Sequence, residues 1–245
     1  MVARNIRTSI TMNIAGMTRV SSFDIDKKKA GEIVKYTIDD LSKYCNDIYF
    51  LLIGNVDENF LSWLRINKII TISSKNYNEG WAFDNYTSLN DLYLTVNKHY
   101  DWIVYPDSDD ILPPQLLEEL WIAEEQKADI LEIPILECIN GYEEVIGDFS
   151  NYIIGPHAKA LKPAPDITFL GSDGFAKPVS SQKRRLKSYH SPYPMRHLRY
   201  VTQELRDARK SINYYQEYFS IPKKTTKYNP LWTFQQYLDE GRKYE

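Results

Sequence analysis

The chain has 245 residues, of which 43% are hydrophobic and 26% charged, and its formal net charge is −3. This length suits one large domain or two small ones, and the small net charge argues against nucleic acid as a partner and predicts at most peripheral contact with a membrane. Its two cysteines, Cys45 and Cys138, lack the paired spacing of a zinc site and favour a reduced, cytoplasmic setting.

Strand and helix patterns alternate along the first part of the chain. Apolar residues three or four positions apart predict helices over 30–45, around 89–96, and from Pro113 and Pro114 onward. Buried strands are predicted at 8–16, 47–55, 67–75, 101–106 and 128–138. This alternation predicts an α/β fold with a mostly parallel central sheet and helices on both faces.

The second half of the chain has a different pattern. Short strands are predicted at 157–162 and 166–171, within a region rich in proline, glycine, serine and basic residues. From Leu198 to Phe219 the apolar residues recur at helical spacing, which predicts a long helix that ends before Pro222. We therefore expect one domain over 1–221 and a tail or short helix over 222–245 that packs on it.

Three carboxylates, Asp107, Asp109 and Asp110, follow the predicted strand 101–106. Ligands of such sheets bind beyond the carboxyl ends of the strands. Two carboxylates about 4 Å apart repel by roughly 4 kcal/mol at an effective dielectric near 20, so a cation is expected among them. Oxygen ligands favour hard ions, which complete their shells with phosphates. The cluster predicts a metal-bridged diphosphate; alternatively it is an acidic turn, with Asp110 capping the helix that begins near Pro113.

The segment DWIVYPDSDDILPPQLLEEL, residues 101–120, resembles the Asp-x-Asp segment of GT-A-fold glycosyltransferases, especially family 2-like enzymes. The similarity includes the apolar strand before the carboxylates and the proline-started helix after them, and the order of predicted elements over 8–139 agrees with it. The resemblance implies a GT-A fold, with a C-terminal helical extension after it. It also implies that Asp107 approaches the nucleotide ribose and the metal, and that Asp109 binds the metal.

The resemblance suggests further candidates in the first half of the chain. Asn55 and Asp57 follow the second predicted strand and are candidates for contact with the base, although an ordinary polar turn explains them equally well. In NEGWAFDNY, the family's Gly80 and Asn85 are kept, while Asp84 lies roughly where arginine is common. Asn85 is therefore a candidate donor contact.

In the second half, Asp173 in GSDG stands where relatives carry a histidine, and it is the candidate base that takes the acceptor's proton. His190 is the candidate third metal ligand, and His197 is the second choice. The basic run 183–187, KRRLK, either closes over the donor phosphates or is a solvated loop.

These features predict a metal-dependent glycosyltransferase that uses Mn²⁺ or Mg²⁺. The donor would be a nucleotide sugar, with UDP or GDP as the carrier, and the acceptor a hydroxyl of a glycan, a lipid-linked molecule or a protein. The resemblance favours inversion at the sugar. Two alternatives stay open: a nucleotidyltransferase, which also pairs carboxylates with a metal and phosphates, and a non-catalytic module that binds a glycan or a partner.

Overall fold

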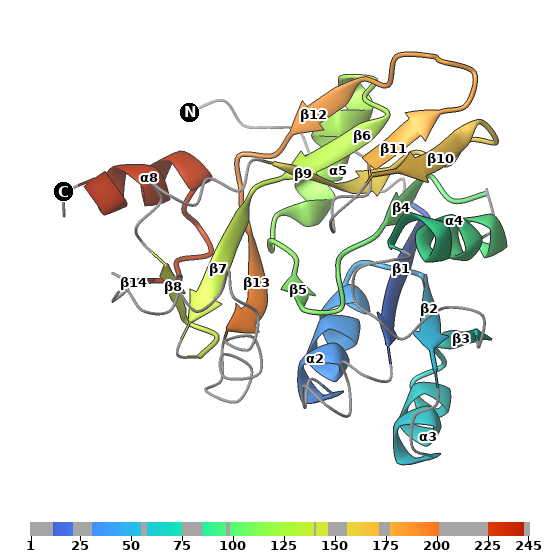
Figure 1. Cartoon of the computed structure of the whole chain (residues 1–245). Coiled ribbons are helices and arrows are strands. Elements are labelled where there is room, and N and C mark those ends of the chain that lie inside the picture. The colour runs from blue at the N-terminus through green and yellow to red at the C-terminus, as the bar shows by residue number, and fades with distance from the viewer. Residues whose placement is uncertain are drawn as a thin grey trace.

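The structure is a computed structural model, and it describes nine segments of the chain: 12–21, 31–54, 58–74, 85–96, 99–139, 141–146, 156–171, 177–200 and 225–242. Among these residues the chain forms two sheets and a separate hairpin (Figure 1). Within the same segments, no helix is both long enough and apolar enough to cross a membrane.

The main sheet has seven strands in the order β12-β6-β9-β4-β1-β2-β3. Its strands are β1 (Ile14–Ser21), β2 (Asp47–Ile53), β3 (Ile70–Ser74), β4 (Trp102–Val104), β6 (Ile130–Ile133), β9 (His157–Leu161) and β12 (Ser188–His190). Only β9 runs antiparallel to its neighbours, β4 and β6. The predicted α/β fold with a mostly parallel sheet is confirmed.

Both faces of the main sheet are covered, because the side chains of its strands alternate between two apolar cores. Trp102 and Val104 of β4 point to a core that contains α2 (Gly31–Leu41), α3 (Glu58–Ile66) and α5 (Leu116–Glu125). Ile103 points to the other core, which is formed with α4 (Asn85–Thr95) and β10 (Ile167–Leu170) of the hairpin that β10 makes with β11 (Lys177–Ser180). Burial on both sides explains why β2 and β4 are continuous apolar runs.

A second sheet has the order β14-β8-β7-β13-β5. Its strands are β5 (Asp110–Ile111), β7 (Ile135–Ile139), β8 (Glu144–Ile146), β13 (Met195–Tyr200) and β14 (Thr225–Lys227). The helix α8 (Phe234–Arg242) places the fully buried Tyr237 in a third apolar cluster with residues of β5, β7, β8 and β13. The division of the chain at 221 and 222 stays a prediction.

Two segments pass from the main sheet into the second sheet side by side (Figure 1). The predicted strand 128–138 is divided at Pro134 into β6 and β7, which belong to different sheets, since proline lacks the N–H that a continuous ladder would need. In the same way β12 leads to β13, and the pairs β12–β6 and β13–β7 are both parallel. Because both segments pass from the main sheet into the second one, β13 comes to lie beside β5, which follows β4.

Besides the divided strand 128–138, three predicted elements differ from the structure. The first strand runs to Ser21, so Gly16 lies within β1 rather than at its end; a Cβ there would lie 3.1 Å from Cys45 Sγ. The helix predicted from Leu198 is wrong at its start, because Met195–Tyr200 is a strand; its remainder lies outside the described residues. The helix α5 begins at Leu116, after both prolines, while α3 and β5 were not predicted.

Candidate functional site

The carboxylate cluster lies at the point where the strand order of the main sheet reverses. The strands β2 and β3 lie on one side of β1, and β4 lies on the other. In open α/β sheets the ligand crevice forms at such a point, outside the carboxyl ends of the strands. Asp107 and Asp109 follow β4 there, and Asp110 begins β5. The predicted position of the cluster is therefore confirmed by the fold.

A buried lysine, Lys159, supplies counter-charge to this cluster. Its side chain is 6% exposed, and its Nζ lies 2.7 Å from Asp107 Oδ2 and 2.7 Å from Asp110 Oδ2. Consecutive residues of β6 pair with Ala160 and Ala158, so Lys159 is the extra residue of a bulge in β9. Bulges commonly redirect a side chain next to a site. The sequence argument inferred a metal ion from the repulsion of these carboxylates, and it missed that part of the counter-charge is in the chain itself.

Asp110 is buried, and its carboxylate contacts Asp107, Lys159 and His197 instead of capping a helix. One oxygen, Oδ2, accepts hydrogen bonds from the Asp107 backbone N–H at 2.9 Å and from Lys159 Nζ, while Oδ1 lies 2.6 Å from His197 Nδ1. The N-cap position of α5 is Gln115, which makes no side-chain capping bond. The capping role expected for Asp110 is therefore wrong, since its carboxylate is taken up by groups from three other segments.

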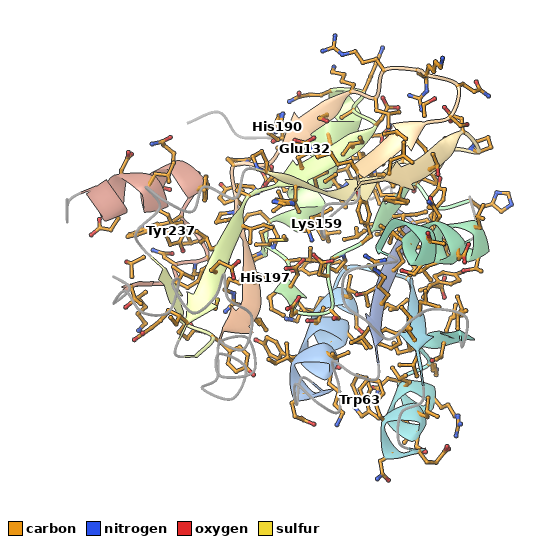
Figure 2. All side chains as sticks on the ribbon, in the orientation of Figure 1. Trp63, Glu132, Lys159, His190, His197 and Tyr237 are labelled. Carbon is orange, nitrogen blue, oxygen red and sulfur yellow. The ribbon has the colours of Figure 1, made fainter. Side chains whose placement is uncertain are left out.

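Strand pairing brings His197 to the cluster. In the antiparallel pair of β13 and β5, His197 lies opposite Asp110, and its side chain is 5% exposed. A carboxylate can only accept, so the Asp110 bond places the proton of His197 on Nδ1. The other nitrogen, Nε2, lies 3.6 Å from Asp109 Oδ2. Figure 2 shows His197 on β13, across from Lys159.

The donor set of Asp109, Asp110 and His197 fits a divalent cation. One ligand atom from each lies within 4.8 Å of the others. Two ligands that each lie about 2.1 Å from one ion are about 3–4 Å apart, which matches the 3.6 Å between Asp109 Oδ2 and His197 Nε2. A carboxylate behind the distal nitrogen of a ligating imidazole is the usual arrangement. Asp109 and His197 could therefore contact an ion directly, with Asp110 orienting the imidazole.

The charges of the cluster shift one another's pKa values. Burial alone would raise the pKa of the Asp110 carboxyl, but Lys159 and His197 outweigh it and lower the pKa. The pKa of Asp107 is likewise lowered by Lys159 against the effect of burial. Burial would lower the pKa of the Lys159 ammonium, yet the two carboxylates raise it. Burial, and then the charge of Lys159, lower the pKa of His157 to about 4. Both carboxylates and the lysine are therefore charged at neutral pH.

The structure brings together Asp107 and Asp109 of the predicted site residues, but not His190. That histidine ends β12, three strand spacings or about 14 Å from β4, and its Nδ1 lies 3.1 Å from Glu132 Oε2 (Figure 2). Asn85 begins α4. Three other predicted residues, Asn55, Asp57 and Asp173, lie outside the described residues.

The basic run 183–187 lies at the end of the main sheet where the parallel strands begin, and the carboxylate cluster lies at the end where they finish. It precedes β12, and the backbone N–H of Asp129, just before β6, donates to the Lys187 carbonyl at 2.7 Å. Because β6 and β4 run in the same direction, this is the edge at which β4 begins. The described residues therefore do not support the expectation that this run closes over a donor at the carboxyl ends.

Sequence reasoning missed Lys159, although a signal was present. The segment HAKAL was predicted as a strand, and it carries a lysine between two alanines. A fully buried lysine is rare unless it is paired. A lysine in the middle of a short apolar strand could therefore have been assigned to the nearest unneutralised carboxylates.

No protein-family model matches the sequence, and no curated protein matches it. Solved structures with some similarity include S. aureus TarS, with 14% identity and a TM-score of 0.47 over 83% of this chain and 39% of that one. A 4-diphosphocytidyl-2C-methyl-D-erythritol synthase from Anaerococcus prevotii has 12% identity and a TM-score of 0.45 over 86% and 97% of the two chains.

A third similar structure is glucosyl-3-phosphoglycerate synthase from Mycobacterium tuberculosis, in complex with Mn²⁺, UDP-glucose and phosphoglyceric acid. It has 15% identity and a TM-score of 0.36 over 51% of this chain and 44% of that one. This chain thus spans less than half of the length of that synthase and of TarS. At these values the similarities assign neither a family nor an activity, and the site is argued from its own geometry.

Proposed function

We propose that this chain is a metal-dependent glycosyltransferase that moves a sugar from a nucleotide-sugar donor to a hydroxyl acceptor. The observation that carries the proposal is the pair Asp109 and His197, which face each other across 3.6 Å at the carboxyl end of β4, with Asp110 hydrogen-bonded behind the imidazole. The resemblance of residues 101–120 to the Asp-x-Asp segment of GT-A enzymes supports the assignment of the reaction.

Asp109 and His197 would hold Mn²⁺ or Mg²⁺, which acts as a Lewis acid toward the departing nucleoside diphosphate when bound. Asp107, whose side chain is 52% exposed, would present its outer oxygen to the nucleotide ribose. Lys159 would keep Asp107 and Asp110 ionised and fixed, so that the imidazole of His197 is positioned before the donor arrives. In this proposal His197 replaces His190 as the histidine ligand.

The remaining roles come from the resemblance alone. Asn55, Asp57 and Asn85 would contact a UDP- or GDP-linked donor, and Asp173 would accept the proton of the attacking hydroxyl of a glycan, lipid-linked or protein acceptor. An in-line attack assisted by such a base would invert the configuration of the transferred sugar.

Calorimetry with UDP and GDP tests the metal-bridged donor. We expect binding with Mn²⁺, a loss of at least tenfold in affinity with EDTA, and a similar loss in Asp109→Asn. The matched control is Asp39→Asn, which makes the same chemical change at an exposed position of α2. Equal affinity with Mn²⁺ and with EDTA would contradict the proposal.

Product analysis then separates the two enzyme classes. A glycosyltransferase releases nucleoside diphosphate from a nucleotide sugar, whereas a nucleotidyltransferase releases pyrophosphate from a nucleoside triphosphate. Metal-dependent binding without either product would instead favour the non-catalytic module.

A further inference from the structure

A cavity of about 440 Å³ lies between the main sheet and the β10–β11 hairpin. Its floor is formed by side chains on one face of three adjacent strands, Glu132 of β6, Ala158 of β9 and Ser188 of β12. Pro178 and Val179 of the hairpin form part of its wall. Figure 1 shows the hairpin beside these strands, on the side of the molecule away from β5.

A second cavity of about 560 Å³ adjoins the first. It is lined by Arg185, Lys187 and His190, and it shares Leu186 and Ser188 with the first cavity. The segment 186–188 therefore contributes to the lining of both cavities, which lie next to each other. The segment 183–187, which contributes to both cavities, lies at the end of the sheet where β4 begins, whereas Ala158 and Pro156 of the first cavity lie toward the carboxyl ends of β4 and β6.

The two cavities carry a strong excess of positive charge in a chain whose net charge is −3. Among the described residues, five basic side chains line them and one carboxylate, Glu132, opposes these; the basic residues are Lys177, Lys183, Arg184, Arg185 and Lys187. A concave surface lined by one sign of charge raises the local concentration of ions of the other sign. The lining is thus complementary to an anion.

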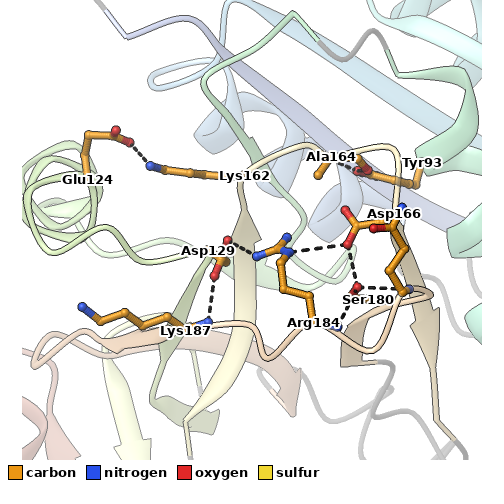
Figure 3. Close-up of polar contacts among 10 residues, drawn as sticks. Tyr93, Glu124, Asp129, Lys162, Ala164, Asp166, Ser180, Arg184 and Lys187 are labelled. Carbon is orange, nitrogen blue, oxygen red and sulfur yellow. Dashed lines mark hydrogen bonds and ion pairs between the residues drawn. The ribbon is translucent and has the colours of Figure 1, made fainter.

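Most of this positive charge has no carboxylate partner among the residues that the structure describes. Arg184 is the exception, because it is paired with two carboxylates (Figure 3). Its Nη1 lies 2.6 Å from Asp129 Oδ1, and its Nε lies 3.5 Å from Asp166 Oδ2. Lys187 Nζ donates to the Gln126 carbonyl, which carries no net charge. Lys177, Lys183 and Arg185 have no carboxylate partner within the described segments. The Arg184 side chain is therefore held in place by its ion pairs, and the other basic side chains are available to a ligand.

The single carboxylate is itself engaged. Glu132 Oε1 accepts a hydrogen bond from Ser188 Oγ at 2.9 Å, and its Oε2 lies 3.1 Å from His190 Nδ1. Because Ser188 and His190 contact its two oxygens, the Glu132 carboxylate repels an incoming anion less than an unpaired carboxylate would. This contact also accounts for the position of His190, which lines the second cavity and lies away from the proposed metal site.

The location distinguishes this space from the donor site. Lys177 begins β11 in the hairpin. Lys183, Arg185 and Lys187 lie in the segment just before β12, and the four residues of β6 alone span about 13 Å along the sheet from there toward the carboxyl edge. A diphosphate held at Asp109 could not reach them. The charge here must serve a different group.

We propose that these two joined cavities, the basic cleft, bind a phosphate-bearing anion other than the donor diphosphate, namely an anionic group of the acceptor. The role as an acceptor subsite rests on the proposed function, whereas the anion site itself does not. Phosphate is favoured because clustered lysine and arginine side chains give it several charge-assisted hydrogen bonds at once.

Calorimetry with inorganic pyrophosphate tests the basic cleft on the full-length chain in EDTA, so that no metal links the probe to Asp109. We expect saturable binding by the wild type, and at least tenfold weaker binding by the double variant Lys177→Glu/Lys183→Asp. Aspartate is chosen at 183 because φ is 60° there, a conformation that aspartate tolerates. The control, Lys227→Glu on β14 in the second sheet, makes the charge reversal of one of these two substitutions at an exposed site and should stay within twofold.

A competition experiment distinguishes the two sources of phosphate. Saturating UDP with Mn²⁺ should leave the affinity for pyrophosphate, measured in excess Mn²⁺, within twofold. Displacement of pyrophosphate by UDP would overturn the acceptor assignment, and no binding, or equal weakening by the control, would overturn the site. Should UDP not bind while pyrophosphate still does, the proposed function fails and the anion site stands.

Discussion

At the scale of single residues, the buried Lys159 joins the fully buried carboxylate of Asp110 to that of Asp107, which is half exposed. Breaking a buried charge cluster by removing one partner typically costs 3–5 kcal/mol, because the remaining charges lose their compensation. For Lys159→Met we therefore expect a loss of about 3–5 kcal/mol in the free energy of unfolding, measured with urea. The control is Lys162→Met, whose partner Glu124 is 42% exposed and whose loss should be below about 1 kcal/mol. Equal losses would mean that Lys159 has no special role.

The neighbouring residues Asp109 and Asp110 should respond differently to the same substitution: Asp110→Asn mainly lowers stability, and Asp109→Asn mainly removes metal binding. Asp110→Asn breaks contacts with Lys159 and His197, so we expect a loss of about 3 kcal/mol in stability and weaker Mn²⁺ binding through a misplaced imidazole. Asp109→Asn should cost less than about 1 kcal/mol and abolish Mn²⁺ binding. Urea titration and the EPR signal of free Mn²⁺ measure the two effects, and identical behaviour of both variants would refute this division.

His157 makes the stability of the fold dependent on pH. Its pKa is lowered to about 4, whereas an unfolded histidine titrates near 6.5, so between these values the unfolded chain binds a proton that the folded chain does not. The free energy of unfolding should therefore fall as the pH falls from 6.5 to 5, by less than about 1.4 kcal/mol per pH unit. His157→Gln should flatten this slope in EDTA, and the exposed His99→Gln should keep it. An unchanged slope in His157→Gln would show that other groups cause it.

The sequence predicted these residues unevenly, for a physical reason. Asp107 and Asp109 were recognisable because of their neighbours in the chain, an apolar strand before them and two prolines followed by a helical pattern after them. Lys159 and His197 reach the cluster through strand pairing across 49 and 87 residues of sequence. Choosing between His190 and His197 required knowing which strand pairs with β5, and local spacing does not contain that information.

At the scale of elements, α2 ties the main sheet to the segment that carries the acidic cluster. Asp40 is buried on this helix, and its Oδ2 accepts a hydrogen bond from the Leu112 backbone N–H at 2.9 Å. The bond spans from α2 to the residue after β5. It thereby fixes the backbone that presents Asp110.

We expect Asp40→Ala to lower the free energy of unfolding by about 1–3 kcal/mol, because it leaves a buried N–H without an acceptor. The adjacent Asp39 is exposed on the same helix, so Asp39→Ala is a matched control with an expected change within about 0.5 kcal/mol. Thermal or urea denaturation measures both. A loss in the control as large as in Asp40→Ala would indicate an effect on helix propensity instead.

Elements with a single dominant pattern were predicted well, and those defined by long-range pairing were not. The strands β2 and β4 are apolar runs that are buried on both sides, and α4 has one apolar face, so local sequence was sufficient. Leu198 fits a helical spacing but is buried in the second sheet as part of β13. The two-residue strand β5 exists only because β13 pairs with it.

At the scale of the whole molecule, the two sheets share structural elements. Helix α2 contributes Val34 and Ile38 to the core of the main sheet and Ile33 to the cluster of the second sheet. The consecutive pairs β6–β7 and β12–β13 also cross from one sheet to the other. The parallel α/β sheet was predictable from the alternation of patterns, whereas the second sheet was not, since its strands are short and distant in sequence. We expect these links to make the sheets unfold together.

The reactivity of the two free cysteines can report the unfolding of each sheet separately. Cys45 follows α2 and lies against β1, and Cys138 lies on β7, so each sheet has its own thiol. Burial raises the pKa of both thiols to about 12, which leaves about one in ten thousand as reactive thiolate at pH 8. In moderate urea, iodoacetamide should modify both cysteines at the same rate by peptide mass spectrometry. Faster modification of Cys138 would instead reveal that the second sheet opens alone, and would turn one alkylation experiment into a map of independently opening parts.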